Sequence, residues 1–387
     1  MNPAVKRTTA LLAVALLLAG CGGQASHPTA SSAARVDSSA GNLPTTLPVA
    51  SPAPLTGAFG VLATSTSADP YIVSIIAPDG KVVASAQASS PARIKCGDVA
   101  AHAVVPAPIS TSDARVYYMD AQGVVRFLTV EGETGRATIV PTGSARRSMF
   151  AVSPDDQRIA VVVSDYTSNG VSLKLYVEDL NGGTNHVDIY SSSGAYGLWP
   201  IGWHGTNNLV LAKVYSCRYD STPDCDIMKN GYRCMSEEFH VVDAATAVRR
   251  FTVGGPDCII DGGPTPAGVA CIDPSSAQVY LVDWTGVKLR LLPSPSPRSA
   301  YLSPDGHLVA LVGCCPSGTT FDGTSRTLDL PTCGWIDSTH VIAGDLPLPT
   351  DDPLHPANPA RVGDVSSGVI VQVAAKGTCA GRLPGGL

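Results

Sequence analysis

The chain has 387 residues, of which 44% are hydrophobic, 15% are charged and only 6% are aromatic, and it contains 38 glycines and 31 prolines. Helical proteins need Glu, Lys, Arg and Leu where this sequence has turn residues, so the composition favours an all-β protein with many turns. The 26 Lys and Arg residues against 32 Asp and Glu residues give a net charge of −6. Since the sequence has no run rich in Lys or Arg, we expect no nucleic-acid partner.

The first residues have the features of an export signal. Lys6 and Arg7 precede an unbroken apolar run that ends in Leu-Ala-Gly-Cys at residues 18–21. As a helix this run would be about 14 Å long, too short for a bilayer core, so residues 1–20 are predicted to be a signal peptide. Leu-Ala-Gly-Cys resembles the lipobox of bacterial lipoproteins. That resemblance implies that Cys21 is acylated and becomes the first mature residue; the alternative is an ordinary secretory signal with an accidental cysteine.

A low-complexity segment follows the signal. Ser, Ala, Pro, Thr and Gly dominate up to about residue 56, and Arg35 and Asp37 are the charged residues there. Such a composition cannot bury enough apolar surface to offset its ordering entropy, so residues 21–56 are predicted to be the lipidated cysteine and a disordered tether. The rest of the chain has no second apolar stretch of about 18 residues. Lipid on Cys21 is therefore the expected membrane attachment, on the outer face of the cytoplasmic membrane.

One unit recurs through residues 57–387, which we predict to be a single domain. Two apolar runs flank a polar turn most clearly at Ser153-Pro154-Asp155-Asp156 and at Ser303-Pro304-Asp305-Gly306. Proline presets φ at the second turn position, and Asp and Gly suit the next two, so these turns predict hairpins. The Asp carboxylates are expected to accept backbone N–H bonds within the turn.

Weaker copies of the same turn lie near residues 68, 113, 205, 266 and 337. The gaps between the seven turns cluster around the roughly 40–50-residue period of propeller blades, and residues 57–387 divide into about seven such units. Six or eight blades stay open, because residues 57–88 and 368–387 could form one shared blade. The pattern resembles the bacterial TolB-like and WD-type β-propellers at the level of architecture, although the Gly-His and Trp-Asp signatures are missing. A pair of β-sandwiches is the alternative fold.

Ten cysteines remain after Cys21, an even number that suits disulfides in an exported protein. Cys258 and Cys271 flank one hairpin and are the first predicted pair, with Cys225 and Cys234 next. The adjacent Cys314 and Cys315 are expected in two separate bridges, with Cys333 as a candidate partner, and not in a redox dithiol. The spacing of Cys217, Cys225 and Cys234 misses the two-to-four intervening residues typical of zinc sites. The full set of candidates is Cys96, Cys217, Cys225, Cys234, Cys258, Cys271, Cys314, Cys315, Cys333 and Cys379.

No nucleophile elbow, phosphate loop, dinucleotide fingerprint or two-His zinc helix occurs in the sequence. We therefore expect no catalysis and no cofactor or metal. The rival hypothesis is a hydrolase, such as a lactonase, with a metal in the propeller channel; the third is a cell-wall carbohydrate-binding module, for which aromatic residues are few. The histidines recur at no common blade position: His102, His186, His204, His240, His307, His340 and His355.

The longest interruption of the repeat covers residues 215–238 and follows the second strand of its unit. It combines three cysteines with Tyr, Met and Arg, a mixture favoured at contact surfaces. The partner-binding candidates are Tyr215, Arg218, Tyr219, Met228, Tyr232, Arg233 and Met235. The alternative is a disulfide-stapled loop that only caps the blade. The sequence thus predicts a monomeric, lipid-anchored propeller that acts as a protein-binding or scaffolding module of the bacterial cell envelope.

Overall fold

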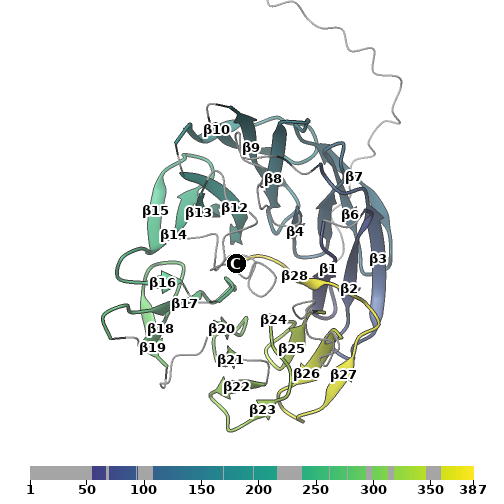
Figure 1. Ribbon diagram of the computed structural model, residues 1–387, viewed down its shortest axis with the longest axis vertical. Coiled ribbons are helices and arrows are strands. Elements are labelled where there is room, and N and C mark those ends of the chain that lie inside the picture. The colour runs from purple at the N-terminus through teal and green to yellow at the C-terminus, as the bar shows by residue number, and fades with distance from the viewer. Residues whose placement is uncertain are drawn as a thin grey trace, which may run out of the picture. The chain divides into compact units, whose positions relative to one another are not determined.

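The computed structural model describes residues 55–66, 69–92, 94, 108–168, 170–194, 196–215, 238–260, 262–276, 278–292, 299–312, 318–345 and 359–387. The chain divides into two units, Met1–Thr45 and Thr46–Leu387, and all of the described residues belong to the second. Their regular structure is entirely β-strand. The 28 strands form seven four-stranded antiparallel sheets. The predicted all-β propeller of seven blades is therefore confirmed (Figure 1).

The blades are numbered here in chain order, each from its innermost strand outward. Blade 1 contains β28 (Thr378–Leu383), β1 (Phe59–Ala63), β2 (Tyr71–Ile76) and β3 (Val82–Ala88). Blade 2 contains β4 (Ile109–Thr111), β5 (Val116–Met119), β6 (Val124–Leu128) and β7 (Thr134–Ile139). Blade 3 contains β8 (Arg146–Val152), β9 (Arg158–Thr167), β10 (Gly170–Asp179) and β11 (Val187–Ser192). Blade 4 contains β12 (Tyr196–His204), β13 (Asn208–Tyr215), β14 (Glu238–Asp243) and β15 (Arg249–Gly254).

The remaining three blades follow the same order. Blade 5 contains β16 (Ile259–Ile260), β17 (Val269–Ile272), β18 (Val279–Val282) and β19 (Lys288–Leu291). Blade 6 contains β20 (Ser299–Leu302), β21 (Val309–Val312), β22 (Thr319–Asp322) and β23 (Thr327–Leu328). Blade 7 contains β24 (Gly334–Trp335), β25 (His340–Ala343), β26 (Arg361–Asp364) and β27 (Ile370–Gln372).

Blade 1 is built from both ends of the propeller sequence. β28 pairs antiparallel with β1, with Phe59 opposite Leu383 and Ala63 opposite Thr378. The yellow β28 thus lies beside the purple β1 in Figure 1. The shared blade held open by the sequence is confirmed, although Ile370–Gln372 of the second segment belongs to blade 7 as β27. The blade count is seven because these two partial units make one blade.

The Ser-Pro-Asp turns fold as predicted. Ser303 Oγ donates to Asp305 Oδ1 at 2.7 Å and accepts the Leu308 N–H at 2.9 Å. Ser153 makes the same pair of bonds in blade 3, to Asp155 Oδ1 at 2.6 Å and from Arg158 N at 2.9 Å. Each turn joins the innermost strand of its blade to the second strand. The turn near residue 68 differs, since it joins β1 to β2, the second and third strands of blade 1.

The blades pack through alternating faces of their strands. On β8, Phe150 joins a buried cluster with Tyr117 and Val125 of blade 2, whereas Ala151 joins the cluster shared with blade 4. Successive residues of a strand point to opposite faces, so each inner strand contributes to two blade interfaces. Indole N–H groups also cross these interfaces. Trp203 Nε1 donates to Ala151 O at 3.1 Å, and Trp335 Nε1 donates to Tyr301 O at 2.9 Å.

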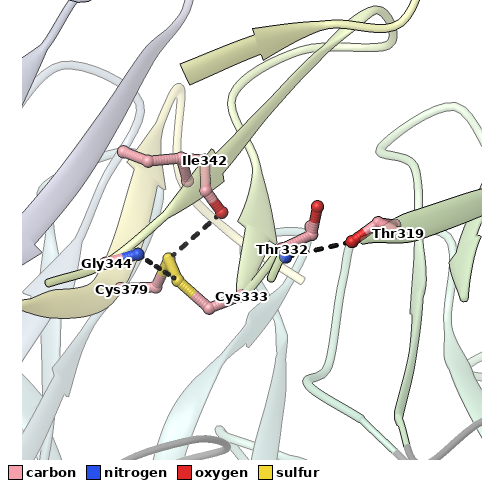
Figure 2. The surroundings of a disulfide bond; sticks show 6 residues. All are labelled: Thr319, Thr332, Cys333, Ile342, Gly344 and Cys379. Atoms are coloured by element: carbon pink, nitrogen blue, oxygen red, sulfur yellow. Dashed lines mark hydrogen bonds between the residues drawn. A yellow bond between two sulfur atoms is a disulfide. The ribbon is translucent and has the colours of Figure 1, made fainter. Parts of the chain in front are cut away.

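Two disulfides lie within the described residues. Cys258 is bonded to Cys271 inside blade 5, as predicted, with the two Cα atoms 5.0 Å apart. Cys333 is bonded to Cys379 on β28, so the suggested partnership of Cys333 with Cys314 or Cys315 is wrong. Figure 2 shows this bond between the segment before β24 and β28, with the Gly344 N–H donating to Cys333 Sγ at 3.2 Å. It ties blade 7 to the strand that closes blade 1.

The Cys333–Cys379 bond is expected to contribute more to stability than the Cys258–Cys271 bond. The two bonds close chain segments with sequence separations of 46 and 13. In the chain-entropy model these loops correspond to losses of about 4 and about 3 kcal/mol on removal. Urea unfolding of Cys333→Ala/Cys379→Ala and of Cys258→Ala/Cys271→Ala measures the difference. An equal or smaller loss for the first pair would contradict the prediction.

Candidate functional site

The two ends of the propeller differ in the length of their connections. Because the blades are antiparallel, the turns after the first and third strands lie at one end, here called the turn end. The connections after the second and fourth strands lie at the other, here called the loop end. The strands joined by the longest connections meet at the loop end: β3 to β4 across residues 89–108, β13 to β14 across residues 216–237, and β25 to β26 across residues 344–360.

At the turn end, aspartates cap the outer turns. Asp243 accepts the N–H groups of Ala245 and Thr246 at 3.1 and 2.9 Å, and Arg250 Nη2 lies 2.7 Å from its other oxygen. These bonds, the Arg250 one above all, lower the pKa of the Asp243 carboxyl. A hydrogen bond from Ser367 likewise lowers the pKa of Asp364. These carboxylates have a structural role in their turns.

A short segment that follows β28 passes close to blades 2, 3 and 4 near their inner turns. In this strap, defined as residues 384–387, the Gly385 N–H donates to Ser112 O of blade 2 at 2.7 Å. The Leu387 N–H donates to Trp203 O of blade 4 at 2.6 Å, and His204 Nδ1 donates to Leu387 O at 2.5 Å. The label C in Figure 1 marks this part of the chain among the inner strands. The strap therefore connects blades 1, 2 and 4 at the turn end.

The strap fits because three of the residues at its contacts are glycines. A Cβ atom on Gly385 would lie 2.5 Å from Thr111 O, and one on Gly386 would lie 3.2 Å from Pro154 Cγ. Gly386 also has a φ of 90°, a conformation that L-residues rarely adopt. On the other side of the contact, a Cβ on Gly202 would lie 2.7 Å from Leu387 Cδ1. Two strap glycines and Gly202 thus permit the close approach.

Buried charges lie beneath the strap. Tyr117 Oη donates to Asp156 Oδ1 at 2.8 Å, and Arg115 Nη1 lies 3.5 Å from Asp156 Oδ2. Burial raises the pKa of Asp156, and it does so against the opposing effects of the Ser112 and Tyr117 hydrogen bonds and the Arg115 charge. Asp156 occupies the turn position that glycine occupies in blade 6, with a φ of 59°. This side chain links blade 3 to blade 2.

A second group of charged side chains contains Asp113 and, on β28, Arg382. Burial, with the Asp156 and Asp155 carboxylates, raises the pKa of Asp113. Burial lowers the pKa of Arg382 on β28, while the charges of Asp113 and Asp337 oppose that effect. Arg382 thus interacts electrostatically with acidic turns of blades 2 and 7. These charges can link β28 to blades 2 and 7 electrostatically; none of the groups forms a nucleophile–base pair.

Most of the residues predicted to bind a partner fall outside the described residues. Tyr215 is the last residue of β13, while Arg218, Tyr219, Met228, Tyr232, Arg233 and Met235 lie in residues 216–237, outside the described ranges. The structure does place that segment between the second and third strands of blade 4, as predicted. Cys21, Cys96, Cys217, Cys225, Cys234, Cys314 and Cys315 also lie outside the described residues. Their lipidation and pairing remain predictions, as do the boundaries at residues 20 and 56.

The described histidines lie apart from one another. His186 is on the outer part of blade 3, where Nε2 lies 2.9 Å from Asp188 Oδ1, and His240 Nε2 lies 2.8 Å from Glu238 Oε2 in blade 4. Within the described ranges, no group of three or more His, Cys, Asp or Glu residues is arranged to hold a metal ion. The same ranges contain no helix long and apolar enough to cross a membrane.

Comparisons with known proteins place the chain only broadly. No family model matches it, and neither does any curated protein. A dihydro-heme d1 dehydrogenase NirN structure is 13% identical, with 88% of this chain and 77% of that chain covered and a TM-score of 0.39. A eukaryotic initiation factor is 10% identical, with 85% and 98% covered and a TM-score of 0.37. Prolyl oligopeptidase B from Galerina marginata is 12% identical, with 70% and 38% covered and a TM-score of 0.37. Likenesses of this size carry no functional argument, and the propeller assignment rests on the strand pairing.

The Gly202→Ala variant is expected to weaken the contact between the strap and blade 4. The nearest atoms to the added methyl group belong to the Leu387 side chain, Cδ1 at 2.7 Å and Cγ at 2.8 Å, so we expect Leu387 and not the blade to shift. Loss of the hydrogen bond to Trp203 O should speed amide exchange at Leu387 roughly fivefold to tenfold, equivalent to about 1 kcal/mol. Hydrogen exchange measures it. Gly182→Ala is the matched control, because nothing lies within 4 Å of its added Cβ; equal exchange in both variants would mean that Gly202 does not seat the strap.

Proposed function

We propose that this chain is a lipid-anchored β-propeller outside the bacterial cytoplasmic membrane, where it holds an envelope protein as a monomer and without catalysis of its own. The observation that carries the proposal is the difference between the two ends. At the turn end the strap binds across the inner turns of blades 2 and 4, whereas the strands joined by the longest connections meet at the loop end. Propellers recognise partners with connections, because their strands are committed to blade packing.

The location outside the cytoplasm is supported by the paired cysteines. Disulfides persist in oxidising compartments and are rare in the cytosol. The bonds Cys258–Cys271 and Cys333–Cys379 agree with an exported protein, and the Leu-Ala-Gly-Cys sequence at residues 18–21 supplies the proposed anchor. The Ser-Pro-Asp turns at Ser153 and Ser303 support, in the same way, a proposed kinship with TolB-like propellers.

The anchor is tested by the Cys21→Ser variant. Without a thiol to acylate, the protein should move from the membrane fraction to the soluble fraction, because residues 57–387 contain no other expected attachment. Detergent phase partitioning and intact-protein mass spectrometry measure the change. Cys258→Ala/Cys271→Ala is a control that removes two cysteines but keeps the lipobox. Continued detergent-dependent recovery of Cys21→Ser would overturn the lipid anchor.

Partner binding is tested by replacing residues 218–233 with a short Gly-Ser link, with Cys217 and Cys234 changed to Ser. The β-type circular dichroism spectrum should persist, because β13 and β14 remain paired, while crosslinks to envelope proteins should disappear. A matched variant replaces residues 347–357, which connect β25 to β26 at the same end of the propeller. Unchanged crosslinks in the folded first variant would show that residues 216–237 only cap blade 4.

A further inference from the structure

Arg147, on β8 of blade 3, is a buried cation that makes few of the hydrogen bonds its guanidinium group can donate. The residue is only 7% exposed. Its hydrogen bond from Nη1 to the Ala92 carbonyl is 3.5 Å long, at the outer limit for such a contact. Nε and Nη2 are both buried and have no hydrogen-bond partner among the residues that the structure describes. Two of the three guanidinium nitrogens therefore face their surroundings without an acceptor.

The two unsatisfied nitrogens form one edge of the guanidinium group. The Nε–H bond and one N–H bond of Nη2 are parallel, and this pair is a fork that an oxyanion can accept with two hydrogen bonds. In Arg290 and Arg361, by contrast, only Nε is buried without a partner. Arg147 thus presents a complete bidentate edge, which sets it apart from the arginines that link the blades.

The neighbouring acid, Asp165, is paired with Arg146 and not with Arg147. Arg146 precedes it on β8 and points to the opposite face, where its Nε lies 2.5 Å from Asp165 Oδ1 and its Nη2 lies 3.1 Å from Asp165 Oδ2. The titratable groups that act on Arg147 are the hydroxyls of Tyr71 and Tyr166. Tyr71 Oη already donates to Met119 O at 2.6 Å. No carboxylate of the described residues is bonded to Arg147.

A buried guanidinium remains charged at neutral pH, and an unpaired buried charge is strongly unfavourable. One negative charge balances it, whereas a phosphate dianion would leave a net charge buried beside two tyrosines. Arg147 lies near the start of β8, at the loop end, and Ala92 belongs to the connection between β3 and β4. We propose that Arg147 is the anchor of a binding site for a small monocarboxylate at the loop end of blade 3. This proposal does not depend on the lipid anchor or on a protein partner.

The test uses the full chain purified in detergent and acetate as the probe. Sodium acetate is titrated against sodium chloride at equal ionic strength and pH 7, with thermal unfolding and saturation-transfer NMR of the acetate methyl group as readouts. The midpoint of unfolding should rise with acetate and then saturate, because a ligand that binds only the folded state stabilises it. Saturation transfer should reach the acetate methyl group from the protein.

Three variants locate the site. Arg147→Met should abolish the acetate response, and Arg147→Lys should weaken the apparent Kd at least tenfold, because an ammonium lacks the parallel fork. Arg146→Met, which removes the neighbouring guanidinium, should respond as the unmodified chain does. If Arg147→Met does not fold, the saturation-transfer signal of Arg147→Lys decides. The absence of an acetate-specific response, an unchanged response in Arg147→Lys, or a stronger response to phosphate than to acetate would each overturn the proposal.

Discussion

Antiparallel pairing between β28 and β1 closes the ring, and the other features of the propeller depend on it. The innermost strands β24, β28, β4, β8 and β12 contact one another in that order, so β28 lies between blade 7 and blade 2. Its residues also carry the groups that reach other blades. Cys379 is disulfide-bonded to Cys333 of blade 7, Arg382 interacts electrostatically with Asp113 and Asp337, and the strap continues from the end of the strand. A single strand thus combines closure, a covalent link and a bridge across the inner turns.

The sequence predicts those features whose interactions are local. The bonds of Ser153 and Ser303 reach only two to five residues ahead, so the turn motif contains everything needed to form them. The Cys258–Cys271 pair is predictable for the same reason, since both residues flank one hairpin. Predicting the Cys333–Cys379 pair would require knowing that blade 7 and blade 1 become neighbours when the ring closes. The turn near residue 68 could be recognised as a hairpin, but its place in blade 1 depends on a strand from the other end of the chain.

The candidate sites were less accessible to sequence reasoning, because they consist of long-range contacts between ordinary residues. Gly385 and Leu387 meet Ser112 and Trp203, and no spacing rule connects these positions. Asp156 looks like an imperfect copy of the turn glycine, yet its carboxylate binds Tyr117 of the next blade. Asp is among the residues that tolerate the left-handed conformation best, so one substitution turns a hairpin position into an inter-blade link. Arg147 is likewise unremarkable in sequence, and only its burial without an acid distinguishes it.

The construction of blade 1 from distant segments also determines the order in which the fold can be completed as the chain is synthesised. β1, β2 and β3 emerge first, but their inner edge stays unpaired until residues 378–383 have emerged. An unpaired strand edge is a template for association with other chains. A nascent or truncated chain without β28 therefore carries an open edge on blade 1 and lacks the bond to blade 7. Only a chain made through Leu383 can pair that edge internally, so the addition of β28 removes a site at which other copies of the chain could associate.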